Sequence, residues 1–180
     1  MELIEGIKAR RSIRKFTDEA VTKEQIEEIV EIARYAPTWK NSQSVRYTLI
    51  LDKEIKDKIA AEAVLGFDWN SKIIQGAPAL VLVCTVDKRA GYERDGSPST
   101  SKGEHWQSYD AGLASEAFCL AAFEKGLGSV ILGIYDEDKV REIAGVAENE
   151  KVSALIPIGK PAEEPQPPKR KEVADLLRVK

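Results

Sequence analysis

Apolar residues recur at helical spacing along much of the chain. Ile26 and Ile29 belong to such a stripe, and Thr22 with Gln25 forms a capping box just ahead of it. Pro37 ends this helix, because a proline disfavours helical backbone in the residue before it. The same spacing predicts helices at residues 3–7, 22–36, 55–63, 108–125, 136–144 and 173–177.

Four other segments have the composition of β-strands. Residues 79–86 form a continuous apolar run after a Gly-Ala-Pro break, which is typical of a central strand buried on both faces. The predicted strands are residues 46–51, 79–86, 129–134 and 152–158. Strands alternating with longer helices in this order predict an α+β fold.

The chain has 180 residues, of which 43% are hydrophobic, enough for one domain with a sizeable core. We therefore expect residues 1–180 to form a single domain. Residues 87–105 are polar and rich in glycine, serine and lysine, a composition that predicts a long functional or mobile loop. Residues 160–171 are polar and proline-rich, and predict an extended arm that either wraps a partner or ends as a floppy tail.

Charge and residue usage exclude several classes of function. The net charge of −3 disfavours nucleic acids and anionic membranes as partners, and no apolar run is long enough to span a bilayer. His105 is the only histidine, so we expect no metal site and no Ser-His-Asp site. Cys84 and Cys119 lie in apolar runs and predict buried thiols in a reducing cytoplasm. An enzyme of this composition would depend on an organic cofactor.

The most basic segment of the chain is the first candidate for binding chemistry. Arg10, Arg11, Ser12 and Arg14 place three guanidinium groups and one hydroxyl within five residues. Forked donors of this kind can surround a phosphate group. A solvated basic helix end, stabilised by the helix dipole, explains the same residues equally well.

A polar turn after the second predicted helix is the second candidate. Asn41 and Gln43 offer amide donors and acceptors that suit the edge of a planar heterocycle, and Trp39 offers a flat stacking surface. Pro37 and Thr38 belong to the same turn. A helix-ending turn whose tryptophan packs inward is the alternative.

Three further segments are weaker candidates. Asn70 and Lys72 could meet the polar edge of a cofactor, or belong to an exposed loop. Gly133, within a predicted strand, indicates either a bulge or close approach of a flat ligand to the backbone. The basic residues 169–171 lie at the end of the arm, where a solvated tail is the simpler interpretation.

The order and spacing of these segments together resemble the nitroreductase family of FMN-dependent oxidoreductases. The two most specific motifs are Arg-Arg-Ser-Ile-Arg-Lys-Phe at residues 10–16 and Ala-Pro-Thr-Trp-Lys-Asn-Ser-Gln at 36–43. Supporting matches, mainly by order, are residues 76–83, 110–114, 126–129 and 156–161.

The resemblance implies an intertwined homodimer with a mixed, mostly antiparallel central sheet flanked by helices, and with FMN at the subunit interface. In it, residues 160–180 form a C-terminal arm that reaches the partner subunit. The chemistry is carried by FMN rather than by a catalytic side chain. By similarity, the residues that contact FMN are Arg10, Arg11, Ser12, Arg14, Pro37, Thr38, Trp39, Asn41, Gln43, Asn70, Lys72, Ile131, Leu132, Gly133, Lys169 and Arg170.

Each group of these residues has an implied task. The basic segment would hold the FMN phosphate and ring edge, with Lys169 or Arg170 closing on the phosphate. The turn at residues 37–43 would come from the other subunit. Lys72 would stabilise the anionic reduced flavin, and Leu132 and Gly133 would line the ring.

The implied activity passes electrons from NADH or NADPH through FMN to nitroaromatic, quinone or similar small acceptors. Relatives use the same fold for dehalogenation, dehydrogenation or flavin breakdown, and these reactions stay open here. A non-catalytic flavin-binding protein is a second alternative. A nucleic-acid binder that uses the basic N-terminal segment is a third, which the acidic total charge disfavours.

Overall fold

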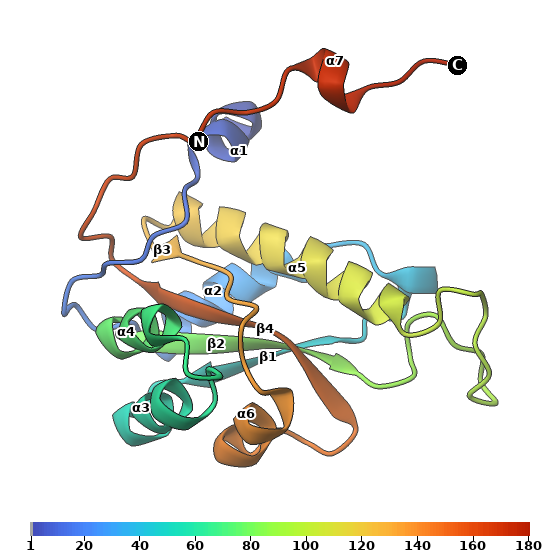
Figure 1. Cartoon of the computed structure of the whole chain (residues 1–180), viewed down its shortest axis with the longest axis horizontal. Coiled ribbons are helices and arrows are strands. Elements are labelled where there is room, and N and C mark those ends of the chain that lie inside the picture. Colours follow the sequence, from blue (N-terminus) through green and yellow to red (C-terminus); the bar gives the residue numbers. More distant parts are fainter. Residues whose placement is uncertain (1) are drawn as a thin grey trace.

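A four-stranded antiparallel sheet in the order β1-β2-β4-β3 lies at the centre of the computed structural model, which describes residues 2–180 (Figure 1). The strands are β1 (Val45–Ile50), β2 (Ala79–Val86), β3 (Gly128–Ser129) and β4 (Glu150–Gly159). The expected α+β fold with a mostly antiparallel sheet is confirmed. One isolated parallel bridge, between Ser12 and Ser129, extends the sheet beyond β3.

Helices cover both faces of the sheet. They are α1 (Leu3–Ala9), α2 (Lys23–Ala33), α3 (Lys53–Glu62), α4 (Asp68–Gly76), α5 (His105–Glu124), α6 (Glu137–Ala144) and α7 (Val173–Leu176), with a short 3-10 turn, η1, at Trp39–Asn41. The predicted capping box is present at the start of α2, where Thr22 and Gln25 exchange side-chain-to-backbone hydrogen bonds. The predicted cap of α6 is also present, because the Asp136 side chain accepts a hydrogen bond from the backbone N–H of Lys139.

Two apolar layers enclose the central strand β2, which is buried on both faces as predicted. Val81 and Val83 pack with Phe118 of α5 and with α2 on one side. Leu80 and Leu82 pack on the other side with apolar residues of α3, α4 and α6. The sheet therefore separates α2 and α5 from the other three covering helices (Figure 1).

Two predicted elements differ from the structure. The strand expected at residues 129–134 ends as β3 at Ser129, because Pro157 of β4 has no N–H to donate opposite Val130. Pairing resumes only as an isolated bridge between Leu132 and Leu155. Residues 68–72, for which the sequence offered an exposed loop, form the first half of α4.

The two ends of the chain lie away from the sheet. The arm beyond Lys160 follows an extended path that ends in α7, on the same side of the molecule as α1 (Figure 1). Leu3 and Ile4 of α1 are 70% and 66% exposed, and Val173 and Leu176 of α7 are 71% and 70% exposed. Within residues 2–180, no helix is long and apolar enough to cross a membrane.

Candidate active site

The basic segment after α1 is fixed to the sheet through its backbone. Ser12 forms the bridge with Ser129, and the Ile13 N–H donates to the Ser129 carbonyl at 3.0 Å. The Ile13 side chain is buried directly over Gly128. The Arg14 N–H donates to the Glu163 carboxylate at 2.7 Å. The backbone is therefore held at several points, and the arginine side chains leave it in different directions.

The three arginines have different surroundings. Arg11 donates to the carbonyls of Lys8 and Arg10 at 2.6 and 2.8 Å, so its guanidinium group satisfies the end of α1. Arg10 lies 3.7 Å from Glu116, and its buried Nε has no hydrogen-bond acceptor among residues 2–180. The Arg14 side chain is exposed, and within residues 2–180 its guanidinium group donates only to the Ser12 carbonyl, at 3.2 Å. Arg10 and Arg14 therefore keep donors available for an anion.

Residues 129–134 connect the basic segment to α4. Ser129 contacts the basic segment, Leu132 exchanges backbone hydrogen bonds with Leu155, and the buried Asn70 side chain donates to the Ile134 carbonyl at 3.1 Å. A methyl group added to Gly133 would meet no atom within 4 Å. One continuous stretch of backbone thus carries the predicted ring-lining residues, with open space beside Gly133.

Several predicted residues lie along this stretch or beside it, and others lie elsewhere. The first group comprises Arg10, Arg11, Ser12, Arg14, Asn70, Ile131, Leu132 and Gly133. Lys72 is exposed and lies on α4, two positions after Asn70. Lys169 and Arg170 lie on the arm and are exposed. Within residues 2–180, no hydrogen bond or ion pair joins either arm residue to the basic segment.

The turn at residues 37–43 lies at the amino-terminal end of α5. The Trp39 ring packs against Trp106, with 4.4 Å between ring centroids, and its buried Nε1 has no partner within the described chain. Asn41 and Gln43 are exposed. The Trp39 ring therefore packs against another residue of the same chain, while the side chains of Asn41 and Gln43 are exposed.

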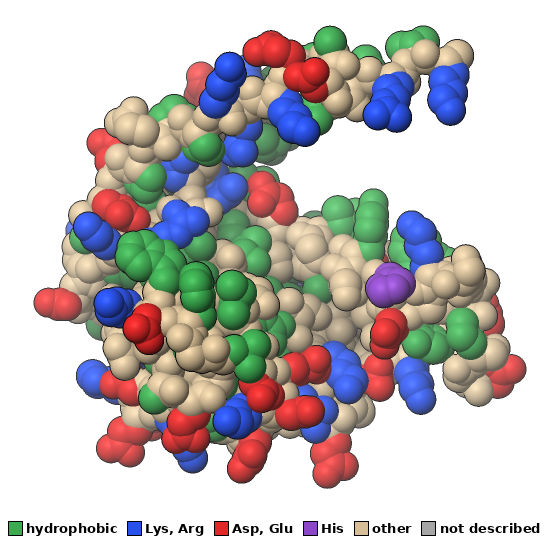
Figure 2. All heavy atoms as spheres, viewed as in Figure 1, with side chains coloured by type: hydrophobic (Ala, Val, Ile, Leu, Met, Phe, Trp, Pro, Cys, Tyr) green, Lys and Arg blue, Asp and Glu red, His purple; other side chains and the backbone are tan. Residues whose placement is uncertain are grey.

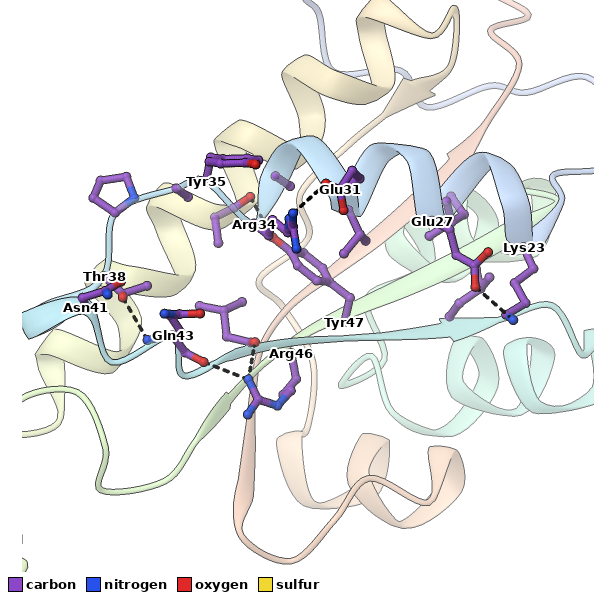
Figure 3. Close-up of a pocket in the computed structure, with 18 residues that line it drawn as sticks. Lys23, Glu27, Glu31, Arg34, Tyr35, Thr38, Asn41, Gln43, Arg46 and Tyr47 are labelled. Atoms are coloured by element: carbon purple, nitrogen blue, oxygen red, sulfur yellow. Dashed lines mark hydrogen bonds and ion pairs between the residues drawn. The ribbon is translucent and has the colours of Figure 1, made fainter.

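A hollow of about 950 Å³ runs along α2 and the outer edge of β1 (Figure 3). The turn supplies four of its lining residues, which are Pro37, Thr38, Asn41 and Gln43. Residues 10–14, residues 131–133 and α4 supply none. Within one chain, the turn predicted to contact the ring therefore lines this hollow, and the segment predicted to bind the phosphate does not.

The sequence interpretation missed Asp110 as a site residue. This side chain is 1% exposed, and both of its carboxylate oxygens lie within 3.0 Å of the Trp39 backbone nitrogen. Burial raises the pKa of Asp110 above its usual value, and the hydrogen bonds from Trp39 and Ser42 oppose that rise. Asp110 begins the supporting match at residues 110–114, but no local pattern indicated its role, since its partner lies 71 residues away.

Comparison with known families decides the identity of this fold. A model of the nitroreductase family matches residues 7–160. The chain belongs to the nitroreductase family. The resemblance drawn from the sequence motifs is therefore confirmed.

Individual relatives cover nearly the whole chain. A protein of Archaeoglobus fulgidus, provisionally named NADH dehydrogenase/NAD(P)H nitroreductase, is 30% identical over 167 residues, which are 91% of this chain and 87% of that protein. A structure of a provisionally named nitroreductase from Exiguobacterium sibiricum in complex with FMN is 25% identical, with a TM-score of 0.86 and coverage of 100% and 98%. The NADPH:FMN oxidoreductase from Vibrio harveyi, complexed with NAD+, is 26% identical, with a TM-score of 0.81 and coverage of 98% and 76%.

Proposed function

We propose that this chain is an NAD(P)H-dependent FMN oxidoreductase that reduces small acceptors such as nitroaromatics or quinones. The observation that carries the proposal is the buried Arg10 Nε, which lacks an acceptor in a segment fixed to the sheet beside Ser129. The Glu116 carboxylate lies 3.7 Å from this Nε, as an ion pair rather than a hydrogen bond. A buried donor without a hydrogen bond is costly, and a phosphate oxygen is the strong acceptor that would satisfy it. Family membership gives that phosphate a source in FMN.

The open space at Gly133 supports the same cofactor. A flat ring can approach the backbone there, because a glycine removes the Cβ that would otherwise stand in the way. Ile131 and Leu132 would contact the ring, and Asn70 and Lys72 would face its polar edge. These residues fit the two ends of an FMN molecule, with phosphate donors at one end and a flat, partly apolar wall at the other.

Bound FMN supplies the electron chemistry, accepting a hydride equivalent from NADH or NADPH and passing electrons to an acceptor. The protein residues would bind FMN and orient its ring. Arg10 and Arg14 would neutralise the phosphate of FMN, and the exposed ammonium group of Lys72 would place a positive charge beside the ring edge. No strong side-chain acid or base is required for this division of labour.

A homodimer completes the site in this proposal. The turn at residues 37–43 and the phosphate segment lie apart in one copy, so the turn of one subunit would serve the cofactor of the other. The arm would carry Lys169 and Arg170 to the phosphate. The exposed apolar residues of α1 and α7 support an interface, because such side chains are usually covered in a stable assembly.

Titration of the cofactor-free protein with FMN tests the proposal, with flavin fluorescence as the measurement. We expect micromolar or tighter binding of FMN, and binding of riboflavin at least about tenfold weaker, because riboflavin lacks the phosphate. Absence of FMN binding would contradict the proposed function. Equal affinity for both ligands would contradict the assignment of the arginine segment alone.

A further inference from the structure

The turn at residues 38–43 has an unusual backbone. Lys40, Asn41 and Gln43 have φ angles of 44°, 52° and 48°, which lie in the left-handed region. Residues with a Cβ adopt this region at a cost, and none of the three is glycine. A turn with three such residues needs contacts from outside its own backbone to hold it.

Asp110 supplies one external contact, in addition to the Lys40–Glu93 ion pair and the packing of Trp39 on Trp106. Its two oxygens lie 3.0 and 2.9 Å from the Trp39 nitrogen, so the N–H at the start of the turn is held by a carboxylate from α5. The Ser42 side chain lies close enough to Asp110 to lower the pKa of the carboxyl group, and its hydroxyl hydrogen-bonds to Ser44 at 3.3 Å. The buried carboxylate therefore lies near residues on both sides of the left-handed Lys40 and Asn41.

Contacts within the turn complete the arrangement. The Ser42 N–H donates to the Trp39 carbonyl at 2.8 Å, and the Gln43 N–H donates to the Thr38 hydroxyl at 3.0 Å. The side-chain amides of Asn41 and Gln43, by contrast, make no hydrogen bond within residues 2–180. The turn is thus internally bonded, and it presents two unpaired amide groups on its exposed side.

Burying a carboxylate at the Asp110 position costs free energy. The side chain is 1% exposed, and neighbouring positions on α5 bury Ala111 and Ala114. Burying a charge costs free energy unless hydrogen bonds compensate for it. The compensating hydrogen bonds come from the turn, so the buried carboxylate and the turn stabilise each other.

We propose that Asp110 is a positioning residue that fixes the left-handed turn so that Asn41 and Gln43 meet the flavin ring. This inference rests on the proposed function for the identity of the ligand. Asp110 itself contacts neither ring nor phosphate in this arrangement. It acts through the backbone N–H of Trp39, which it holds at the start of the turn.

Two variants of Asp110 and one matched control test the inference. Asp110→Ala removes the acceptor, Asp110→Asn keeps one carbonyl oxygen, and Asp136→Ala removes a comparable carboxylate-to-backbone bond at α6, across the sheet. We expect the FMN dissociation constant to rise at least about tenfold in Asp110→Ala, to rise less in Asp110→Asn, and to stay unchanged in Asp136→Ala. Equal FMN affinity in wild type and both Asp110 variants would overturn the inference.

Amide hydrogen exchange on the full-length protein without cofactor separates the two proposals. We expect faster exchange confined to residues 38–44 in both Asp110 variants, and no change there in Asp136→Ala. Unchanged exchange in this segment overturns the positioning role even if FMN binds. If the wild-type protein binds no FMN but the Asp110 variants still show faster exchange at residues 38–44, the flavin function is overturned. The role of Asp110 in holding the turn then remains. Asp110→Asn retains an acceptor and the side-chain shape, so it keeps the test valid if Asp110→Ala fails to fold.

Discussion

The guanidinium groups of Arg10 and Arg14 have few hydrogen-bond acceptors within residues 2–180. Glu116 stands 3.7 Å from Arg10, which is beyond hydrogen-bond distance, and the exposed Arg14 reaches only the Ser12 carbonyl. Arg11 is different, because it caps the last turn of α1 through the Lys8 carbonyl. Both interpretations of the basic segment therefore apply, but to different residues: a helix end for Arg11, and an anion site for the other two.

The double variant Arg10→Ala with Arg14→Ala is predicted to weaken FMN binding. Each lost charge-assisted contact is worth roughly 1.5–3 kcal/mol, so the dissociation constant should rise by at least about tenfold. Fluorescence titration with FMN and with riboflavin is the measurement, and riboflavin binding should change much less. Lys53→Ala with Lys58→Ala removes the same charge from the surface of α3 and serves as the control. Unchanged FMN affinity in the arginine variant would show that the segment is only a charged helix end.

Local structure was predictable from the sequence wherever the signal lay within a few residues. The capping box of α2 needs only Thr22 and Gln25, three positions apart, and it forms as predicted. Asp110 was not predictable in this way, because its partner Trp39 is brought near it only by the packing of the turn against α5. The inward packing of the Trp39 ring on Trp106 depends on the same tertiary contact.

The stretch from Gly128 to Ile134 shows where prediction of elements succeeded and failed. Its β-rich composition predicted a strand, and the register with β4 is kept at Ser129 and Leu132. The strand breaks between them because Pro157 on the neighbouring strand cannot donate. Strand composition is visible in one segment, but the break depends on a proline elsewhere in the chain. The helix α4 was missed because its apolar pair, Ile73 and Ile74, follows a polar start.

Two glycines in this stretch should respond differently to substitution. Gly133→Ala creates no clash within the chain, so we expect unchanged thermal stability but FMN binding weakened by about tenfold, because the methyl group would meet the ring. Gly128→Ala would place a methyl group 2.6 Å from Ile13, so we expect it to lower stability by about 1–3 kcal/mol and to shift the basic segment. Gly76→Ala meets no neighbouring atom and is the control. Thermal melts and FMN titration of the three variants check this, and normal FMN affinity in Gly133→Ala would contradict a ring beside that glycine.

The whole molecule carries apolar surface that one copy leaves uncovered. The arm stands clear of the body, with an open gap beneath it (Figure 2). Leu177 and Val179 near its end are 62% and 89% exposed, and Ile7 of α1 is 53% exposed. Such an arm has little reason to be held in a closed monomer, which is the physical argument for a second copy. The prolines of residues 160–171 predict an extended arm, but they do not indicate where that arm would lie in the proposed dimer.

Removal of residues 169–180 is predicted to weaken both the dimer and FMN binding, because the arm would supply apolar contacts and two phosphate-facing cations. Lys169→Ala with Arg170→Ala is the matched variant, and we expect it to stay dimeric while its FMN affinity falls. Light scattering coupled to size exclusion, followed by FMN titration, distinguishes the two effects. A full-length protein that is monomeric at all concentrations would refute the assembly, and a truncated protein with unchanged mass and affinity would refute the role of the arm.

Anaerobic stopped-flow spectroscopy of the FMN-loaded protein tests the central claim most directly. The protein is mixed first with NADH or NADPH and then with a panel containing a nitroaromatic, a quinone and a halogenated phenol. We predict that at least one nicotinamide removes the visible absorbance of the bound flavin, and that the nitroaromatic or the quinone restores it. Flavin absorbance that stays unchanged with both NADH and NADPH would contradict the account and leave a protein that binds flavin without using it.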